Sequence, residues 1–314
     1  MMIERARHDV SVVVPVYNSS TILPKLVKEL GAVLSACAGR YELILVNDSS
    51  SDQSWAVIGE ISRQYPWVHG INLMRNVGQH NALLCGIRSA KFDVLVTLDD
   101  DLQNPPDEIP RLLEKLDEGF DVVYGIPEQQ QHGLWRNLAS RVTKTVLQNA
   151  MGAEIAKNIS AFRAFRTPVR GSFEHYRGPF VSIDVLLTWG TTRFGALRVR
   201  HAPRLEGTSG YRLRTLIAHT LNMMTGFSVL PLQIASFIGF TFTIIGLLTL
   251  AYVIARYFIQ GNPVPGFPFL ASIIAMFSGA QLFALGIIGE YLSRMHFRAM
   301  EKPAYTVRSA TQTE

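Results

Sequence analysis

Apolar and polar positions follow two periods over the first 125 residues. Short runs rich in Val, Ile and Leu predict buried strands at 10–14, 41–46, 68–73, 94–98 and 121–124. The segments between them carry apolar residues at helical spacing and predict helices at 23–35, about 52–65, 81–90 and 107–118. This alternation is typical of a doubly wound, mostly parallel sheet, so we expect an α/β fold of Rossmann-like type. Two later strands are expected at 162–165 and 196–199.

The pattern changes near the end of the chain, where two long stretches lack charge. From Val229 to Ala255 no residue is ionisable apart from a tyrosine, and Phe267–Gly289 is a second uncharged stretch. Each is long enough to cross a bilayer core of about 30 Å. A turn rich in Gly and Pro joins them, which predicts a transmembrane hairpin of about 229–258 and 267–289. The alternative, two buried core helices, is disfavoured because two adjacent stretches reach this length.

Basic residues concentrate on the two sides of the hairpin away from its turn. By the positive-inside rule, both chain termini are expected in the cytoplasm. The charged N-terminal residues have no apolar run, so no signal peptide is expected. We therefore predict a cytoplasmic domain over 1–225, the hairpin within 226–300 and a mobile cytoplasmic tail over 301–314. An amphipathic segment at 135–151 suits either a membrane interface or a surface helix packed on the core.

Composition narrows the classes of partner. The net charge is +5, from 30 basic and 25 acidic residues. Nucleic-acid binding calls for a basic stripe with interleaved aromatic residues, which this sequence lacks. Lys and Arg lie instead near the apolar segments, which favours contact with lipid headgroups or phosphates. The two cysteines have no metal-binding spacing and are expected to be reduced and structural.

The strongest chemical signal is the run Asp99-Asp100-Asp101 at the end of a predicted buried strand. Three carboxylates there repel one another and resist burial. A divalent cation removes this cost, because Mg²⁺ and Mn²⁺ prefer oxygen ligands. The carboxyl edge of an open α/β sheet is also where such folds bind ligands. The alternative is a solvated acidic turn before a helix.

Four polar segments would meet at that edge of the sheet: 15–18, 47–52, 75–80 and 99–106. With these segments, the chain resembles the family 2 glycosyltransferases of GT-A fold. It is most similar to membrane-anchored polyprenyl-phosphate glycosyltransferases, which include bacterial undecaprenyl-phosphate enzymes and dolichyl-phosphate mannose synthases. The resemblance covers nearly the whole chain, including the hairpin and the segment 204–211.

The resemblance implies roles on the donor side. Pro15, Tyr17 and Asn18 would bind the nucleotide, as would Asp48 and Arg75. Asp99 and Asp101 fall on the catalytic DxD pair, which grips the donor diphosphate through Mg²⁺ or Mn²⁺. Gln103 falls on a position that also reaches the metal, and Asp100 would add a nearby charge.

On the acceptor side, the resemblance implies that Arg163 and Arg204 hold a phosphate and that Ser209 belongs to a loop closing over both substrates. An Arg fork suits phosphate because it donates two parallel charged hydrogen bonds. The chain departs from the family pattern at Ser19, at Ser49 and at Gly210, where a lysine is common. Loss of that lysine could be compensated by Arg212.

The function implied is inverting transfer of a sugar, first of all from UDP-glucose, to undecaprenyl phosphate or a related polyprenyl phosphate. The alternatives are mannose from GDP-mannose, an amino sugar, or a non-catalytic membrane scaffold that keeps the fold. A processive polysaccharide synthase is disfavoured because no QxxRW motif is present. The family resemblance further implies a homotetramer.

Overall fold

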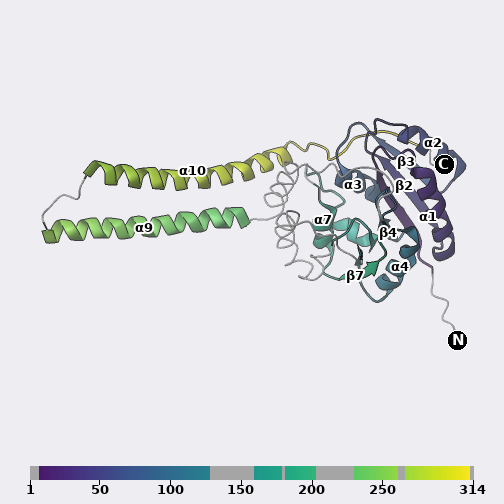
Figure 1. Cartoon of the computed structure of the whole chain (residues 1–314), viewed down its shortest axis with the longest axis horizontal. Coiled ribbons are helices and arrows are strands. Elements are labelled where there is room, and N and C mark those ends of the chain that lie inside the picture. Colours follow the sequence, from purple (N-terminus) through teal and green to yellow (C-terminus); the bar gives the residue numbers. More distant parts are fainter. Residues whose placement is uncertain (1–6, 128–158, 179–180, 203–229, 261–265, 312–314) are drawn as a thin grey trace. The chain divides into compact units, whose positions relative to one another are not determined.

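The structure, a computed structural model, describes residues 7–127, 159–178, 181–202, 230–260 and 266–311. The chain divides into two compact units. One comprises Met1–Leu213 together with Glu301–Glu314, and the other comprises Arg214–Met300. Figure 1 shows the sheet and its helices in the first unit and two long helices in the second.

The first unit is built on an eight-stranded sheet with the order β7-β5-β6-β4-β1-β2-β3-β8. Its strands are β1 (Val10–Val16), β2 (Tyr41–Asn47), β3 (Val68–Leu73), β4 (Val94–Thr97), β5 (Val122–Pro127), β6 (Arg163–Arg166), β7 (Phe194–Val199) and β8 (Val307–Ala310). The central strands β4, β1, β2 and β3 are parallel, and β5 pairs in parallel with β7. The predicted mostly parallel α/β fold is therefore confirmed.

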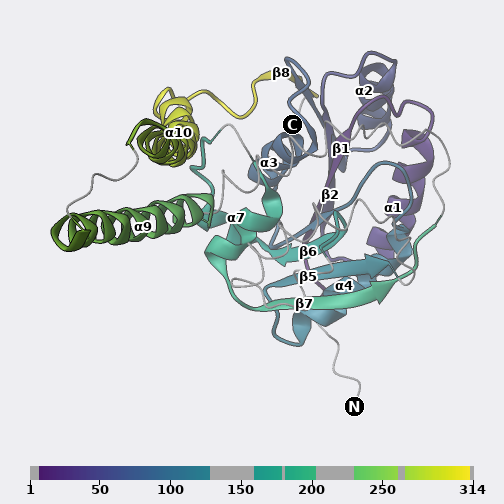
Figure 2. The same ribbon diagram turned by 60° about the vertical axis from the view of Figure 1, so that its left-hand side comes forward.

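Helices cover both faces of this sheet (Figure 2). They are α1 (Leu23–Cys37), α2 (Ser54–Gln64), α3 (Gln79–Ser89), α4 (Ile109–Asp117) and α7 (Ile183–Gly190), with a short 3₁₀ turn before α4 (Pro106–Glu108) and another after β6 (Thr167–Ser172). In α1 the apolar stripe from Leu23 to Leu34 is fully buried, in one core cluster with residues of β1, β2 and β4. Burial of such a stripe, rather than helix propensity alone, stabilises helices of this length.

On the other face, α3 approaches the sheet closely at Gly86. A Cβ atom added there would lie 2.3 Å from Cγ1 of Val13 and 3.0 Å from Cγ2 of Val46. We expect Gly86→Ala to lower the free energy of unfolding by about 1–3 kcal/mol, because the helix must move off the sheet. Thermal unfolding in detergent would measure this.

Gly59 in α2 provides the matched control. A Cβ atom there meets nothing within 4 Å. Gly59→Ala should therefore stabilise the protein slightly, by up to about 1 kcal/mol, through helix propensity. Equal unfolding temperatures for the two variants would contradict the close packing of α3.

Three features of the first unit differ from the sequence-based expectation. β6 is antiparallel to both β4 and β5 and lies between them, although it follows both in the chain. α7 was not predicted. The expected mobile tail instead forms β8, which pairs antiparallel with β3 and closes that edge of the sheet.

Backbone and side-chain hydrogen bonds hold the end of the chain. The amide of Met74 donates to the carbonyl of Thr306, and the amide of Gly70 donates to Oγ1 of Thr311 at 2.8 Å. Every residue of β8 is exposed. The strand therefore has no apolar face from which a sequence pattern could identify it.

The second unit contains α9 (Leu230–Gln260) and α10 (Gly266–Ala299). Within the described residues, one segment, Leu232–Arg256, is long and apolar enough to cross a membrane. The helices touch through an edge-to-face pair of Phe242 and Phe277, whose ring centres are 5.9 Å apart. The second predicted span, along α10, stays a prediction.

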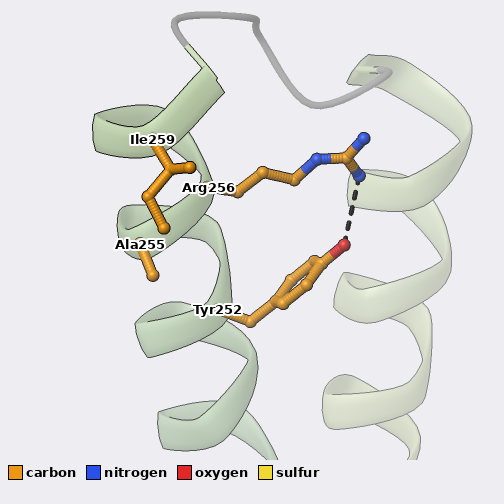
Figure 3. Close-up of a pocket in the computed structure, with 4 residues that line it drawn as sticks. All are labelled: Tyr252, Ala255, Arg256 and Ile259. Atoms are coloured by element: carbon orange, nitrogen blue, oxygen red, sulfur yellow. Dashed lines mark hydrogen bonds between the residues drawn. The ribbon is translucent and has the colours of Figure 1, made fainter.

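The apolar part of α9 ends at a polar pair. Nη1 of Arg256 donates to the hydroxyl of Tyr252 one turn earlier, at 3.1 Å. These side chains line a pocket with Ala255 and Ile259 (Figure 3). None of the four polar segments at the sheet edge contributes to this pocket, so it is not the candidate site.

Candidate functional site

The candidate site lies where β1, β2 and β4 end. Because these strands are parallel, their carboxyl ends lie at the same sheet edge, which is where open α/β sheets bind ligands. Each following loop contains one non-glycine residue with positive φ: Asn18 at 54°, Ser49 at 55° and Leu102 at 56°. Such conformations are uncommon outside glycine and cluster at functional sites.

The first two loops are joined by hydrogen bonds. Oδ1 of Asn18 accepts from the amide of Ser51 at 2.9 Å, and the amide of Asn18 donates to Oγ of Ser50 at 3.0 Å. The amide of Ser19 donates to Oγ of Ser54 at 2.9 Å. Ser19, one of the departures from the family pattern, thus belongs to a tightly connected loop pair. Asn18 serves this connection in the structure.

Asp52 accepts hydrogen bonds from the loop after β1 and from the start of α2. Burial raises its pKa, but hydrogen bonds from Ser54 and Ser20 outweigh that effect and lower the pKa of Asp52 from 3.8 to about 2. A depressed carboxyl pKa adds stability above pH 3.8 that is lost as the pH falls towards 2. We expect Asp52→Asn to lose less stability than the wild type on acidification from pH 5 to pH 2. Unfolding temperatures across this range would measure it, with the exposed α2 carboxylate variant Glu60→Gln following the wild-type profile; parallel curves for Asp52→Asn would contradict the prediction.

Asp48 at the end of β2 organises the third loop. Its Oδ1 accepts from the amide of Val77 and its Oδ2 from the amide of Gly78, both at 2.8 Å. Burial raises the pKa of Asp48, and these two hydrogen bonds oppose the rise. Gly78, with φ of 89°, then starts α3. The predicted nucleotide ligand Asp48 therefore also fixes the loop that carries Arg75.

The acidic turn after β4 uses its three carboxylates differently. Oδ1 of Asp99 accepts from Nε2 of Gln79 at 2.5 Å. Oδ1 of Asp101 accepts from the amide of Gln103 at 3.1 Å. Oδ2 of Asp100 accepts from the amide of Tyr17 at 3.3 Å and ties the turn to the β1 loop. Burial raises the pKa of Asp100, consistent with a carboxylate turned into the protein.

This donor set suits a divalent cation shared with a ligand. Among the described residues, no group of three His, Cys, Asp or Glu side chains could hold a metal by itself. Asp99 and Asp101, two positions apart in one turn, provide hard oxygen ligands, and Gln103 adds an amide oxygen. Mg²⁺ and Mn²⁺ commonly combine one or two carboxylates with phosphate oxygens, so the turn fits such an ion.

Two predicted donor contacts face solvent. Tyr17 is 52% exposed, and Arg75 in the third loop is exposed as well. Pro15 lies within β1 and pairs with Val46. Tyr17, Arg75 and the acidic turn thus come from three loops at one edge. Arg204, Ser209, Gly210 and Arg212, and the predicted helix at 135–151, lie outside the described residues.

Arg163 is placed differently from a surface phosphate ligand. It is 1% exposed, and its Nη1 pairs with Oδ1 of Asp184 at the start of α7. Nε of Arg163 donates to Oγ1 of Thr97 at 3.1 Å, and the hydroxyl of Tyr124 donates to Asp184 at 3.1 Å. Sequence reasoning missed Asp184 and Tyr124. The only signal was a single carboxylate inside the apolar run 183–187.

Arg200, the residue after β7, pairs with two carboxylates that follow the acidic turn in the chain. Nε of Arg200 donates to Oε1 of the buried Glu108 at 2.7 Å, and Nη2 donates to Asp107 at 2.5 Å. Hydrogen bonds to these two carboxylates raise the pKa of Arg200. The amide of Ala202 donates to the carbonyl of Gln103 at 2.9 Å. The residues just before Arg204 are therefore hydrogen-bonded to the segment that follows the three aspartates.

Comparison with known proteins identifies the family of the chain. The sequence profile described as "Glycosyl transferase family 2" matches residues 11–171. The undecaprenyl-phosphate 4-deoxy-4-formamido-L-arabinose transferase of Enterobacter sp. (strain 638) is 34% identical over 308 residues, covering 96% of this chain and 94% of the relative. The enzyme of that name from Pectobacterium carotovorum is 35% identical over 304 residues, covering 96% and 93%.

Solved structures show the same fold at low identity. Glucosyl-3-phosphoglycerate synthase from Mycobacterium tuberculosis, crystallised with Mn²⁺, UDP-glucose and phosphoglyceric acid, aligns with a TM-score of 0.51 and 16% identity. The alignment covers 69% of this chain and 78% of that chain. The same synthase with Mn²⁺, UDP and glucosyl-3-phosphoglycerate gives a TM-score of 0.50 at 15% identity, with the same coverage.

Proposed function

The chain belongs to glycosyl transferase family 2, and on that basis we propose that it transfers a sugar from a nucleotide-sugar donor to a polyprenyl phosphate. One observation carries the proposal: similarity to undecaprenyl-phosphate sugar transferases extends beyond residue 171 over nearly the whole chain. It therefore includes the hairpin unit. A polyprenyl tail stays in the bilayer while its phosphate reacts, so a membrane segment in the same chain as the catalytic domain suits this acceptor. The apolar segment of α9 also supports a location at the membrane.

The donor sugar is an amino sugar in this proposal. The relatives from Enterobacter and Pectobacterium are both named as transferases of 4-deoxy-4-formamido-L-arabinose. This supports the amino-sugar alternative better than UDP-glucose, the donor expected first from the sequence. UDP-glucose is bound by the mycobacterial synthase, whose 16% identity supports the fold alone. We infer a UDP-linked 4-amino-4-deoxypentose derivative as the donor class.

The donor diphosphate lies at the acidic turn. Asp99, Asp101 and Gln103 would hold Mg²⁺ or Mn²⁺, which as a Lewis acid neutralises charge developing on the nucleotide leaving group. Asp48 keeps the Arg75 loop in place through two backbone hydrogen bonds. The exposed ring of Tyr17 is available to the nucleotide base. Asp100 keeps the β1 loop against the acidic turn.

The acceptor is already a nucleophile. A phosphate monoester carries negative charge at neutral pH, with a second pKa of about 6, so a strong general base is not required. Its oxygen attacks the anomeric carbon from the face opposite the leaving diphosphate, and the configuration inverts. Catalysis then depends on positioning and electrostatics. Arg204 and Ser209 are proposed to hold this phosphate. The buried Arg163 is proposed to support the site through its hydrogen bond to Thr97.

The test is an assay of the full-length protein in detergent with Mn²⁺, undecaprenyl phosphate and one donor at a time. The donors are UDP-4-deoxy-4-formamido-L-arabinose, UDP-glucose and GDP-mannose, and mass spectrometry identifies the glycolipid. We expect the formamido sugar to be transferred most efficiently. Transfer of glucose or mannose alone would refute the donor assignment. Metal-dependent nucleotide binding with no glycolipid from any donor would favour a non-catalytic scaffold.

A further inference from the structure

Arg163, Asp184 and Tyr124 form a buried charge cluster. The Arg163 guanidinium is 1% exposed and pairs with Asp184, which is 8% exposed. The ring of the fully buried Tyr124 lies 5.8 Å from the guanidinium carbon, and its hydroxyl donates to the same Asp184 oxygen. A buried cation is costly unless it is paired and hydrogen-bonded. Asp184 is therefore the counterion that compensates the buried charge of Arg163.

Arg163 connects this cluster to the acidic turn. Its Nε donates to Oγ1 of Thr97 at 3.1 Å, and Thr97 donates onward to the carbonyl of Ala161 at 2.8 Å. Thr97 is the last residue of β4 and lies two positions before Asp99. Arg163 is thus hydrogen-bonded to the strand end from which the acidic turn starts.

A second route leads from α7 back to the same carboxylate. The amide of Ile183, next to Asp184, donates to Nδ1 of His80 at 3.4 Å. His80 follows Gln79 at the start of α3, and Gln79 donates to Asp99 at 2.5 Å. The start of α7 is thus linked to Asp99 both through β6 and β4 and through α3.

We propose that Asp184 is a positioning residue for the acidic turn. It acts through Arg163 and Thr97 to fix where the Asp99 carboxylate meets the donor diphosphate. The inference rests on the proposed function for its substrate, a nucleoside diphosphate bound with a divalent cation. The competing explanation is that the cluster only stabilises the fold.

Variants that remove one or both charges of the Arg163–Asp184 pair separate the two explanations. Asp184→Asn leaves the buried Arg163 without its counterion and should both destabilise the protein and lower kcat by about 100-fold through misplacement of the turn. The double variant Arg163→Met/Asp184→Leu removes both charges, and replacing a buried pair by apolar residues is often neutral for stability. It should regain most of the unfolding temperature while kcat stays at least about tenfold low.

Tyr124→Phe is the mildest variant, because it removes one hydrogen bond and keeps the ring. It should retain the wild-type fold and lower kcat by about three- to tenfold. Asp117→Asn is the matched control, since that carboxylate forms partly exposed pairs with His8 and Arg166 away from the acidic turn. It should leave kcat within about twofold of wild type.

Unfolding temperature, kcat and KM for the donor are measured for each variant, together with Mn²⁺-dependent binding of UDP by calorimetry. We expect Asp184→Asn and the double variant to weaken UDP binding by about tenfold in the presence of Mn²⁺. Recovery of both kcat and UDP affinity in the double variant would overturn the inference, as would wild-type values in Asp184→Asn. UDP binding needs no acceptor, so it tests Asp184 even where wild-type protein makes no glycolipid and the proposed function fails.

Discussion

Replacing Asp101 with asparagine lowers the rate of sugar transfer by about 10²–10³-fold, and Asp99→Asn has an effect of similar size. Each substitution removes one negative charge from the oxygen ligands that are proposed to bind the metal and the diphosphate. The loss is expected mainly in kcat, because charge on the leaving group develops as the glycosidic bond breaks. Initial rates at saturating donor over a Mn²⁺ series would measure it, and excess Mn²⁺ should restore only part of the rate.

Asp100→Asn is the control within the same run. Its carboxylate accepts the amide of Tyr17, and an amide oxygen can accept the same hydrogen bond. We expect its transfer rate to stay within about tenfold of wild type. An equal loss in all three variants would contradict the division of roles in the turn and favour a general effect of acidic charge.

Asp48→Ala produces the second large effect, on donor binding and on stability together. The substitution removes the acceptor of two backbone amides, those of Val77 and Gly78. Unsatisfied buried donors cost about 1–3 kcal/mol each, and the loop reduces that cost by moving towards solvent. We expect a loss of about 2 kcal/mol in the free energy of unfolding and a rise of about tenfold or more in KM for the donor, because Arg75 moves with the loop.

Asp48→Asn is the graded comparison. Its amide retains one acceptor oxygen, so unfolding temperature and KM should fall between those of the wild type and Asp48→Ala. Calorimetry of UDP binding, combined with thermal unfolding, would measure both effects. A wild-type KM in Asp48→Ala would show that the third loop keeps its place without this carboxylate.

The sheet and the acidic site could be predicted because their signals are local in sequence. Buried parallel strands appear in the sequence as runs of apolar residues. The helices between them carry apolar stripes such as that of α1. Asp99-Asp100-Asp101 is conspicuous because a charge cluster follows a buried strand directly. The parallel order then brings the loops after β1, β2 and β4 to one edge without further information.

The Asp184 cluster could not be predicted, because its members meet only through non-local strand order. β6 lies between β4 and β5, although it follows both in the chain, and this order pairs Arg163 with Thr97 on one side and with Tyr124 on the other. The family resemblance implied that Arg163 is a phosphate ligand, and neither α7 nor Asp184 was singled out from the sequence. β8 was missed for a different reason: it is held by the free backbone edge of β3, which side-chain patterns do not describe.

The return of the chain to the sheet makes the helical hairpin an insertion in the catalytic domain rather than a C-terminal appendage. The first unit contains Met1–Leu213 and also Glu301–Glu314. Ending the chain before the hairpin would strip β8 from the sheet and expose the edge of β3, and uncovered edges promote aggregation. A water-soluble version of the enzyme is better made by replacing 214–300 with a flexible linker, so that the last strand is kept.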